Sequence, residues 1–271
     1  MGQGVFRHAQ LAWLLGFRSR VFRGLATIGV FLLFFAWLSG AFSLRQPAIV
    51  AMDVGLSGLR FLGTFFVLYW VQEVFMRDVE RRTVMLALAY PVSRASYLVG
   101  RWLGVVALVA MTIAVWAAGL AILAQVSDWG YAESIHPQLG LAFLTVLLGI
   151  LVDMLVVSVF AVWLTSFAQT PMVPLLGGAG FAVAARFLGP SMDYLQFSIS
   201  ADQAMSARML PILDAMRWVI PDLSRLDWRA AVLYDRWPSA GDMAGGTALA
   251  LGYVLIFATL AARNYQRRDF S

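Results

Sequence analysis

The chemistry open to this chain is carried by arginine and carboxylate side chains, because its 271 residues include no cysteine and no lysine. The lack of cysteine excludes disulfides, cysteine nucleophiles and cysteine-ligated zinc. The lack of lysine excludes Schiff-base chemistry and the Walker A loop, which ends in Gly-Lys-Ser/Thr. If the protein uses ATP, we therefore expect another chain to hydrolyse it.

The most densely charged segment is 73–104, which lies between two long apolar runs and holds five arginines and three acidic residues. We interpret its centre, about 78–89, as a short cytoplasmic helix. Pro91 ends this helix, because proline disfavours helical geometry in the residue before it. The helix has an apolar stripe that consists of Val79, Leu86 and Ala89. Arg81 and Arg82 can meet acidic groups of a partner protein, although the segment could instead be an ordinary basic loop.

A second group of ionisable side chains lies inside apolar runs: Arg60, Asp153 and Arg186. At about 1.5 Å of rise per residue, all three lie roughly 21–24 Å from the predicted inner ends of their spans, in a core about 30 Å thick. An unpaired charge at that depth costs about 2.5–3.5 kcal/mol. We predict an Asp153–Arg186 pair, since a tight turn joins their two spans. This intramembrane polar cluster either fixes helix packing or forms a polar patch on a substrate path.

The composition indicates a membrane protein, since 61% of the residues are hydrophobic and 13% are charged. A soluble domain has about 45–50% apolar and about 25% charged residues. The surplus of apolar surface requires lipid, so we predict an all-α polytopic membrane protein that forms a single transmembrane domain over 1–271. The six predicted spans are about 24–44, 56–76, 102–125, 139–167, 171–189 and 243–262.

The segment before the first span, 1–23, has apolar residues at helical spacing: Phe6, Ala9, Trp13, Phe17 and Val21. This spacing predicts an amphipathic helix on the cytoplasmic membrane surface. The alternative is a positively charged lead-in to the first span.

The long polar segment 190–242, before the last span, contains two amphipathic patterns. The first consists of Met209, Ile212, Leu213, Met216 and Ile220, and Pro221 ends it. The second consists of Leu223, Leu226, Ala230 and Leu233. Both predict short helices on the outer face of the spans, either packed there as a loop or acting as a lid over a translocation path.

The distribution of arginine predicts the topology. The segments 1–23 and 77–101 and the C-terminal tail hold four, five and three arginines, while the short loops on the opposite side hold one and none. The positive-inside rule therefore places both termini in the cytoplasm of a multi-pass inner-membrane protein. Because most arginines flank apolar runs, we do not expect a nucleic-acid partner.

The histidines do not form a metal site, since His8 and His136 have no second ligand at helical spacing. No Gly-x-Ser-x-Gly elbow appears, and Asp153 is the single intramembrane acid. We therefore expect a chain that is not itself an enzyme and that binds no metal or cofactor.

Three elements of the charged segment have a recognisable spacing: Glu80-Arg81-Arg82-Thr83, Pro91-Val92-Ser93-Arg94 and Gly100-Arg101. The pattern resembles the signature of ABC type-2 transporter permeases, in which Glu-x-Gly-Thr is followed by Pro-x-Ser-Arg and then Gly-Lys at the same spacing. Here Arg82 replaces the Gly, Ala87 replaces one of two leucines and Arg101 replaces the Lys. The element Pro221-Asp222-Leu223 is similar to a Pro-Asn-Leu element of the copper-processing and gliding-type branch.

The resemblance implies a half-transporter that works with two copies of an ATP-binding-cassette ATPase and with a second permease copy or a paralogue. ATP and magnesium would be bound by the ATPase, and closure of the ATPase pair would re-orient the spans to export a substrate. The resemblance also implies an ATPase-coupling interface that comprises Asp78, Glu80, Arg81, Arg82, Thr83, Leu86, Pro91 and Arg94.

The alternative is a secondary transporter, or a membrane scaffold that does not transport, without an ATPase. A secondary transporter should carry an ion-coupling carboxylate in a broken span. Asp153 is the one candidate, and its neighbours Val152, Met154 and Leu155 provide no Gly or Pro break.

Overall fold

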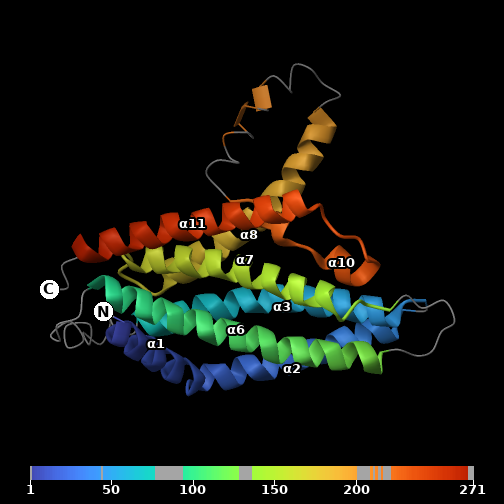
Figure 1. Cartoon of the computed structure of the whole chain (residues 1–271), viewed down its shortest axis with the longest axis horizontal. Coiled ribbons are helices and arrows are strands. Elements are labelled where there is room, and N and C mark those ends of the chain that lie inside the picture. The colour runs from blue at the N-terminus through green and yellow to red at the C-terminus, as the bar shows by residue number, and fades with distance from the viewer. Residues whose placement is uncertain are drawn as a thin grey trace.

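A computed structural model of the chain describes residues 2–43, 45–76, 94–127, 136–199, 208–209, 211–212, 215 and 221–267 (Figure 1). The regular elements among these residues are all helices, and six are long and apolar enough to cross a membrane. These six are α2 (Arg20–Ala41), α3 (Pro47–Val71), α6 (Arg94–Val126), α7 (Leu141–Thr165), α8 (Met172–Ile199) and α11 (Ala240–Arg267). The predicted all-α class with six apolar helices is confirmed.

Helix α3 lies at the centre of the bundle, where it contacts α2, α6, α7 and α8 (Figure 1). Its apolar side chains Leu56, Val67 and Trp70 are fully buried. The start of α1 (Gly2–Phe17) and the end of α11 lie at the same end of the bundle. The central position of α3 makes it the helix from which charged side chains can reach several neighbours.

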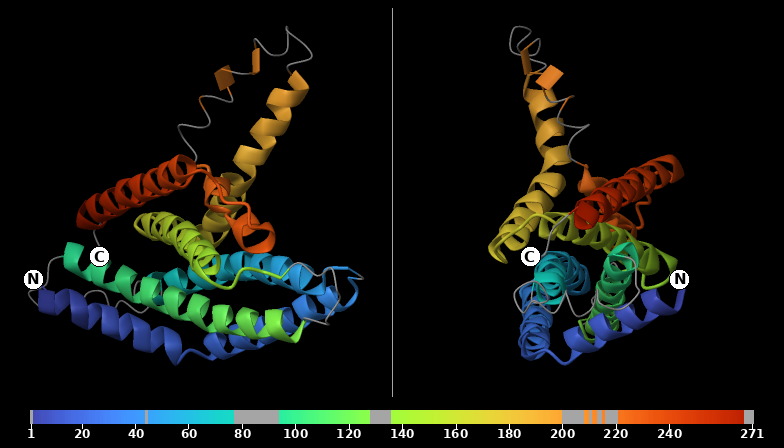
Figure 2. Two further views of the ribbon diagram at one scale, coloured as in Figure 1. Left: turned by 45° about the vertical axis from the view of Figure 1, so that its right-hand side comes forward. Right: turned by 90° about the vertical axis from the view of Figure 1, so that its left-hand side faces the viewer.

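Two helices extend beyond the predicted spans, in each case at a proline. Helix α3 begins at Pro47 and not near residue 56, because proline is well suited to the first turn of a helix, where its missing N–H has no role. The predicted outer loop 45–55 is therefore mostly helical. Helix α8 continues through Pro190 to Ile199 instead of ending at 189, and its second half projects away from the bundle (Figure 2).

The N-terminal segment forms two helices where the sequence suggested one. Helix α1 ends at Phe17, and α2 starts after Ser19, whose hydroxyl accepts a hydrogen bond from the backbone N–H of Phe22 at 3.0 Å. Such a cap satisfies an otherwise unpaired N–H at the start of a helix. The exposed side chain of Phe6 fits the predicted surface helix.

Helix α1 packs closely along the first part of α6, and two glycines of α6 permit the approach. A Cβ atom at Gly104 would lie 2.5 Å from the Cβ of Ala12 and 2.6 Å from the carbonyl oxygen of Ala9. A Cβ atom at Gly100 would lie 2.7 Å from the carbonyl oxygen of Val5. This Gly-x-x-x-Gly spacing lets the two backbones approach each other, as it does between membrane helices.

The second predicted amphipathic pattern forms a folded segment, residues 221–234, which we call the strap. It contains a 3-10 turn (η2, Leu223–Leu226) and a short helix (α10, Arg229–Tyr234). Leu223, Leu226 and Leu233 are buried as predicted, whereas Ala230 is exposed. Most of the first predicted pattern, 209–220, lies outside the described residues.

Three glycines, one on each of three helices, let η2 lie close to the bundle. A Cβ atom at Gly149 of α7 would lie 2.7 Å from the carbonyl oxygen of Leu226, and one at Gly189 of α8 would lie 2.6 Å from the carboxylate of Asp222. A Cβ atom at Gly246 of α11 would lie 3.2 Å from that of Arg225. The strap therefore lies directly on the backbones of α7, α8 and α11.

Candidate functional site

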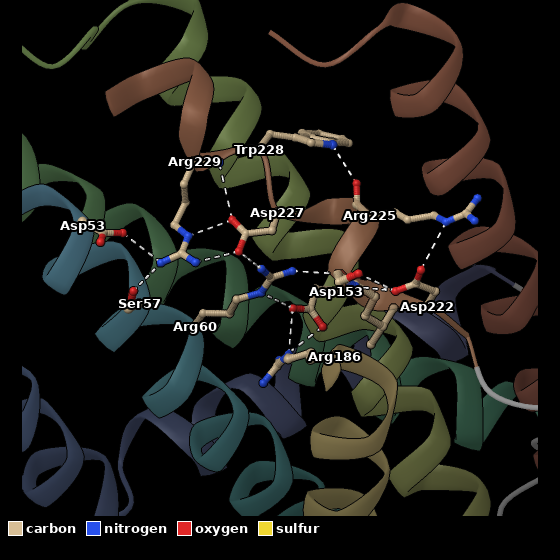
Figure 3. Close-up of polar contacts among 12 residues, drawn as sticks. Asp53, Ser57, Arg60, Asp153, Arg186, Asp222, Arg225, Asp227, Trp228 and Arg229 are labelled. Atoms are coloured by element: carbon tan, nitrogen blue, oxygen red, sulfur yellow. Dashed lines mark hydrogen bonds and ion pairs between the residues drawn. The ribbon is translucent and has the colours of Figure 1, made fainter. Parts of the chain in front are cut away.

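The site is centred on Asp153 of α7, whose side chain is 0% exposed (Figure 3). Its carboxylate accepts hydrogen bonds from two arginines, Arg60 of α3 and Arg186 of α8. The predicted contact between Asp153 and Arg186 is confirmed, and Arg60 joins them. One buried carboxylate thus contacts two guanidinium groups, so one of the two positive charges requires a further carboxylate as its partner.

Arg186 is directed by a two-point contact with Asp153. Its Nε and Nη2 donate to the two carboxylate oxygens at 3.1 and 3.2 Å, and its Nη1 donates to the hydroxyl of Thr64 at 2.8 Å. Such bidentate pairs fix the geometry of both side chains. Arg186 therefore ties α8 to α7 and, through Thr64, to α3.

Arg60 uses all three of its nitrogens and links the buried carboxylate to the strap. Its Nε donates to Asp153 at 2.6 Å, its Nη1 pairs with the carboxylate of Asp227 at 3.0 Å and its Nη2 donates to the carbonyl oxygen of Leu223 at 3.0 Å. Asp227 is the missing second negative charge. It comes from the strap and not from a membrane helix.

Arg229 links the strap to the N-terminal part of α3. It makes a two-point contact with Asp227, at 2.8 Å for each bond, and pairs with Asp53 at 2.9 Å. It also donates to the hydroxyl of Ser57. Three arginines and three aspartates thus form one chain of ion pairs, with a formal charge of zero, that runs across α8, α7, α3 and the strap.

The charges of the strap residues are reinforced by their surroundings. Burial raises the pKa of Asp227, but the hydrogen bond from Arg229 and the positive charges of Arg60 and Arg229 together bring it below the ordinary value of 3.8. Burial lowers the pKa of Arg229, but Asp227 and Asp53 together raise it above its ordinary value. Both groups therefore stay ionised throughout the neutral range.

The ion pairs of Asp227 should contribute the same stability at every pH from 5 to 8. A carboxyl whose pKa is lower in the folded protein stabilises the fold fully above its ordinary pKa, and this contribution is lost as the pH falls through the folded value. We expect the difference in thermal midpoint between the wild type and Asp227→Asn to stay constant from pH 8 to pH 5 and to shrink below about pH 3.8. A difference that already changes between pH 8 and 6 would contradict this, and the exposed Asp235→Asn is the control.

An apolar region lies beside the ion pairs. A small cavity is bounded by Leu59, Gly63, Trp70 and Met154, among others, and two of these adjoin the polar residues Thr64 and Asp153 in the sequence. Its lining atoms are apolar, so we expect this small cavity to be dry.

The predicted coupling interface falls almost wholly outside the described residues. The segment 77–93 contains all of its residues except Arg94, which is the first residue of α6. The segment is preceded by a π-helical stretch (η1, Gln72–Met76), whose Val74, Phe75 and Met76 are buried. Beyond it, Arg101 is 7% exposed and lies over the ring of Tyr97 at 5.4 Å.

A comparison with protein-family models matches residues 17–270 to the ABC-2 family transporter protein model. The chain belongs to the ABC-2 family. A comparison with curated proteins finds no match. Because the match covers nearly the whole chain, this ABC-2 protein is a multi-pass membrane permease component of an ABC transporter. Membership implies association with an ABC ATPase subunit and disfavours the alternative of a secondary transporter or scaffold.

Sequence reasoning missed the part of this ABC-2 permease's ion-pair chain that lies beyond Arg60. Asp53 lies between the predicted spans 24–44 and 56–76, and the sequence analysis does not single out Asp227 or Arg229 of the strap. One signal was available: the strap carries alternating charges at Asp222, Arg225, Asp227 and Arg229 among apolar residues that the pattern buries. Such alternation beside a predicted apolar face indicates pairing on the bundle.

Proposed function

We propose that this permease works as half of an exporter, with a second permease copy or a paralogue and with two ATPase subunits that bind ATP and magnesium. The observation that carries the proposal is the family match together with the signature spacing between Thr83, Pro91 and Gly100. The arginine distribution supports placing both termini, and the segment 77–93, in the cytoplasm.

In this proposal, the segment 78–89 docks on the ATPase, and its movement reaches the bundle through α3 and α6. The segment lies between η1, which continues α3, and Arg94, which starts α6. Helix α3 also carries Arg60 and Asp53, so a shift of this helix acts directly on the ion-pair chain. A movement of the cytoplasmic end of α3 would thereby reach the strap, which contacts the opposite half of the same helix.

Reversing the charge of the coupling segment should detach the ATPase. We expect the double variant Arg81→Glu/Arg82→Glu to lose an ATPase subunit that co-purifies with the tagged wild type in mild detergent. The control is Arg263→Glu/Arg267→Glu, which makes the same charge change on exposed residues at the end of α11. Mass spectrometry identifies the partner, and ATP hydrolysis by the eluate measures its amount.

The control variant should retain the partner. Equal recovery of the ATPase with the wild type and with Arg81→Glu/Arg82→Glu would refute docking through this segment. Loss of the partner in both double variants would mean that net charge, and not the coupling segment, determines the association.

A further inference from the structure

Two oxygen atoms of the strap contact the two terminal nitrogens of the Arg60 guanidinium group. Nη1 of Arg60 lies 3.0 Å from the carboxylate of Asp227 (Figure 3). Nη2 lies 3.0 Å from the carbonyl oxygen of Leu223. These two nitrogens lie side by side on the planar guanidinium group, which matches the spacing of two oxygens of one carboxylate or phosphate. A single oxyanion could therefore replace both strap contacts.

Charge balance favours an anion at this position. Asp153 is shared between Arg60 and Arg186, so these three residues carry a net charge of +1 once Asp227 is removed. Arg229 also loses its two-point partner when Asp227 leaves, while Asp53 and Ser57 keep it attached to α3. The departure of the Asp227 carboxylate thus leaves two guanidinium groups, Arg60 and Arg229, facing the position that it held.

Solvent reaches this position more easily than it reaches the buried carboxylate. The side chain of Asp227 is 26% exposed and that of Arg60 is 12% exposed, whereas Asp153 is fully buried. An anion can therefore displace Asp227 without disturbing the contact between Asp153 and Arg186. The inner pair would hold the helices together while the outer position changes its occupant.

We propose that Arg60 and Arg229 form a binding site for an anionic group of the transported substrate, a phosphate or a carboxylate. The carboxylate of Asp227 occupies this site when no substrate is bound. The assignment of this ligand to transport rests on the proposed function. The binding itself depends only on the charges and the geometry. In the cycle, the substrate's anionic group displaces Asp227, and Asp227 returns when the substrate leaves.

The test is binding of defined anions to the purified full-length chain in neutral dodecyl maltoside micelles, which needs no ATPase. The probes are dodecyl phosphate, inorganic phosphate and the cationic dodecyltrimethylammonium. We expect Asp227→Asn to bind a phosphate probe about tenfold more tightly than the wild type, because a competing negative charge is removed. Asp235→Asn, an exposed aspartate outside the ion-pair chain, should bind like the wild type.

Replacing Arg60 in addition to Asp227 should abolish the gain in phosphate affinity. The double variant Arg60→Gln/Asp227→Asn stays balanced in charge, since Arg186 keeps Asp153 and Arg229 keeps Asp53. It should therefore fold, as judged by its elution and melting profile, and bind phosphate no better than the wild type. Arg229→Gln/Asp227→Asn is a second variant with the same expected result.

Each outcome is decisive. A gain with both phosphate probes supports a site that recognises the anionic group alone, and a gain with dodecyl phosphate only supports an anionic amphiphile. Equal affinity of Asp227→Asn and the wild type, a gain that survives both arginine substitutions, or an equal gain for the cationic probe would overturn the proposal. Failure here would leave the ATPase pull-down unaffected, so the two proposals fail separately.

Discussion

Asp153→Asn is expected to lower the free energy of unfolding by about 3–5 kcal/mol, the loss typical when one partner of a buried ion pair is removed. Asparagine keeps the shape of aspartate but not its charge. Arg60 and Arg186 would then share a neutral acceptor, and Asp227 would be the carboxylate that still contacts Arg60. Because three helices meet at Asp153, the loss should affect the whole bundle.

The measurement is denaturant titration of the purified protein in detergent micelles, with Asp235→Asn as the matched control. Asp235 is exposed and has a positive φ of 53°, a conformation that asparagine also adopts readily. Adding Arg186→Gln to Asp153→Asn should recover part of the loss, since Arg60 then pairs with Asp227. A variant that is as stable as the wild type but altered in transport would favour a role on the substrate path over a role in packing.

Gly104→Ala is expected to separate α1 from α6 and to lower stability. The new methyl group would meet the Cβ of Ala12 and the carbonyl oxygen of Ala9, and a backbone atom cannot rotate away. Overpacking of this kind costs about 1–3 kcal/mol. The gain in helix propensity on replacing glycine, about 0.5–1 kcal/mol, offsets only part of this cost.

The control is Gly252→Ala on α11, where a Cβ atom would meet nothing within 4 Å. This change should be neutral or slightly stabilising. Tryptic cleavage after the exposed Arg18, between α1 and α2, should accelerate in Gly104→Ala but not in the control. Equal cleavage rates and equal stability in the two variants would contradict close packing at Gly104.

The sequence could predict the helices, because each apolar run had to be long enough to cross a membrane. The predicted spans stop short of the helices at Pro47 and Pro190, because the first turn of α3 and the interior of α8 accept proline. The pair Asp153–Arg186 was predictable from equal depth and a short turn between the spans. Both observations concern two consecutive spans of the chain.

The strap contacts were not predictable in the same way. Leu223 and Arg60 are 163 residues apart, and no periodicity of the chain relates a polar segment to one position on a distant helix. The glycines that contact the strap were equally unpredictable, because Gly149, Gly189 and Gly246 lie on three different helices. Their shared role appears only when the three backbones meet.

The spacing of the ion pairs along the chain also sets an order for biosynthesis. Arg60 is synthesised 93 residues before Asp153, and Asp153 is synthesised 33 residues before Arg186. Helix α3 is therefore synthesised before its buried partner exists, whereas α7 and α8, which carry Asp153 and Arg186, follow each other directly. Arg60 gains its second carboxylate partner, Asp227, only when the strap has been synthesised. In a nascent or truncated protein that lacks the strap, Arg60 and Arg186 have one carboxylate, Asp153, between them.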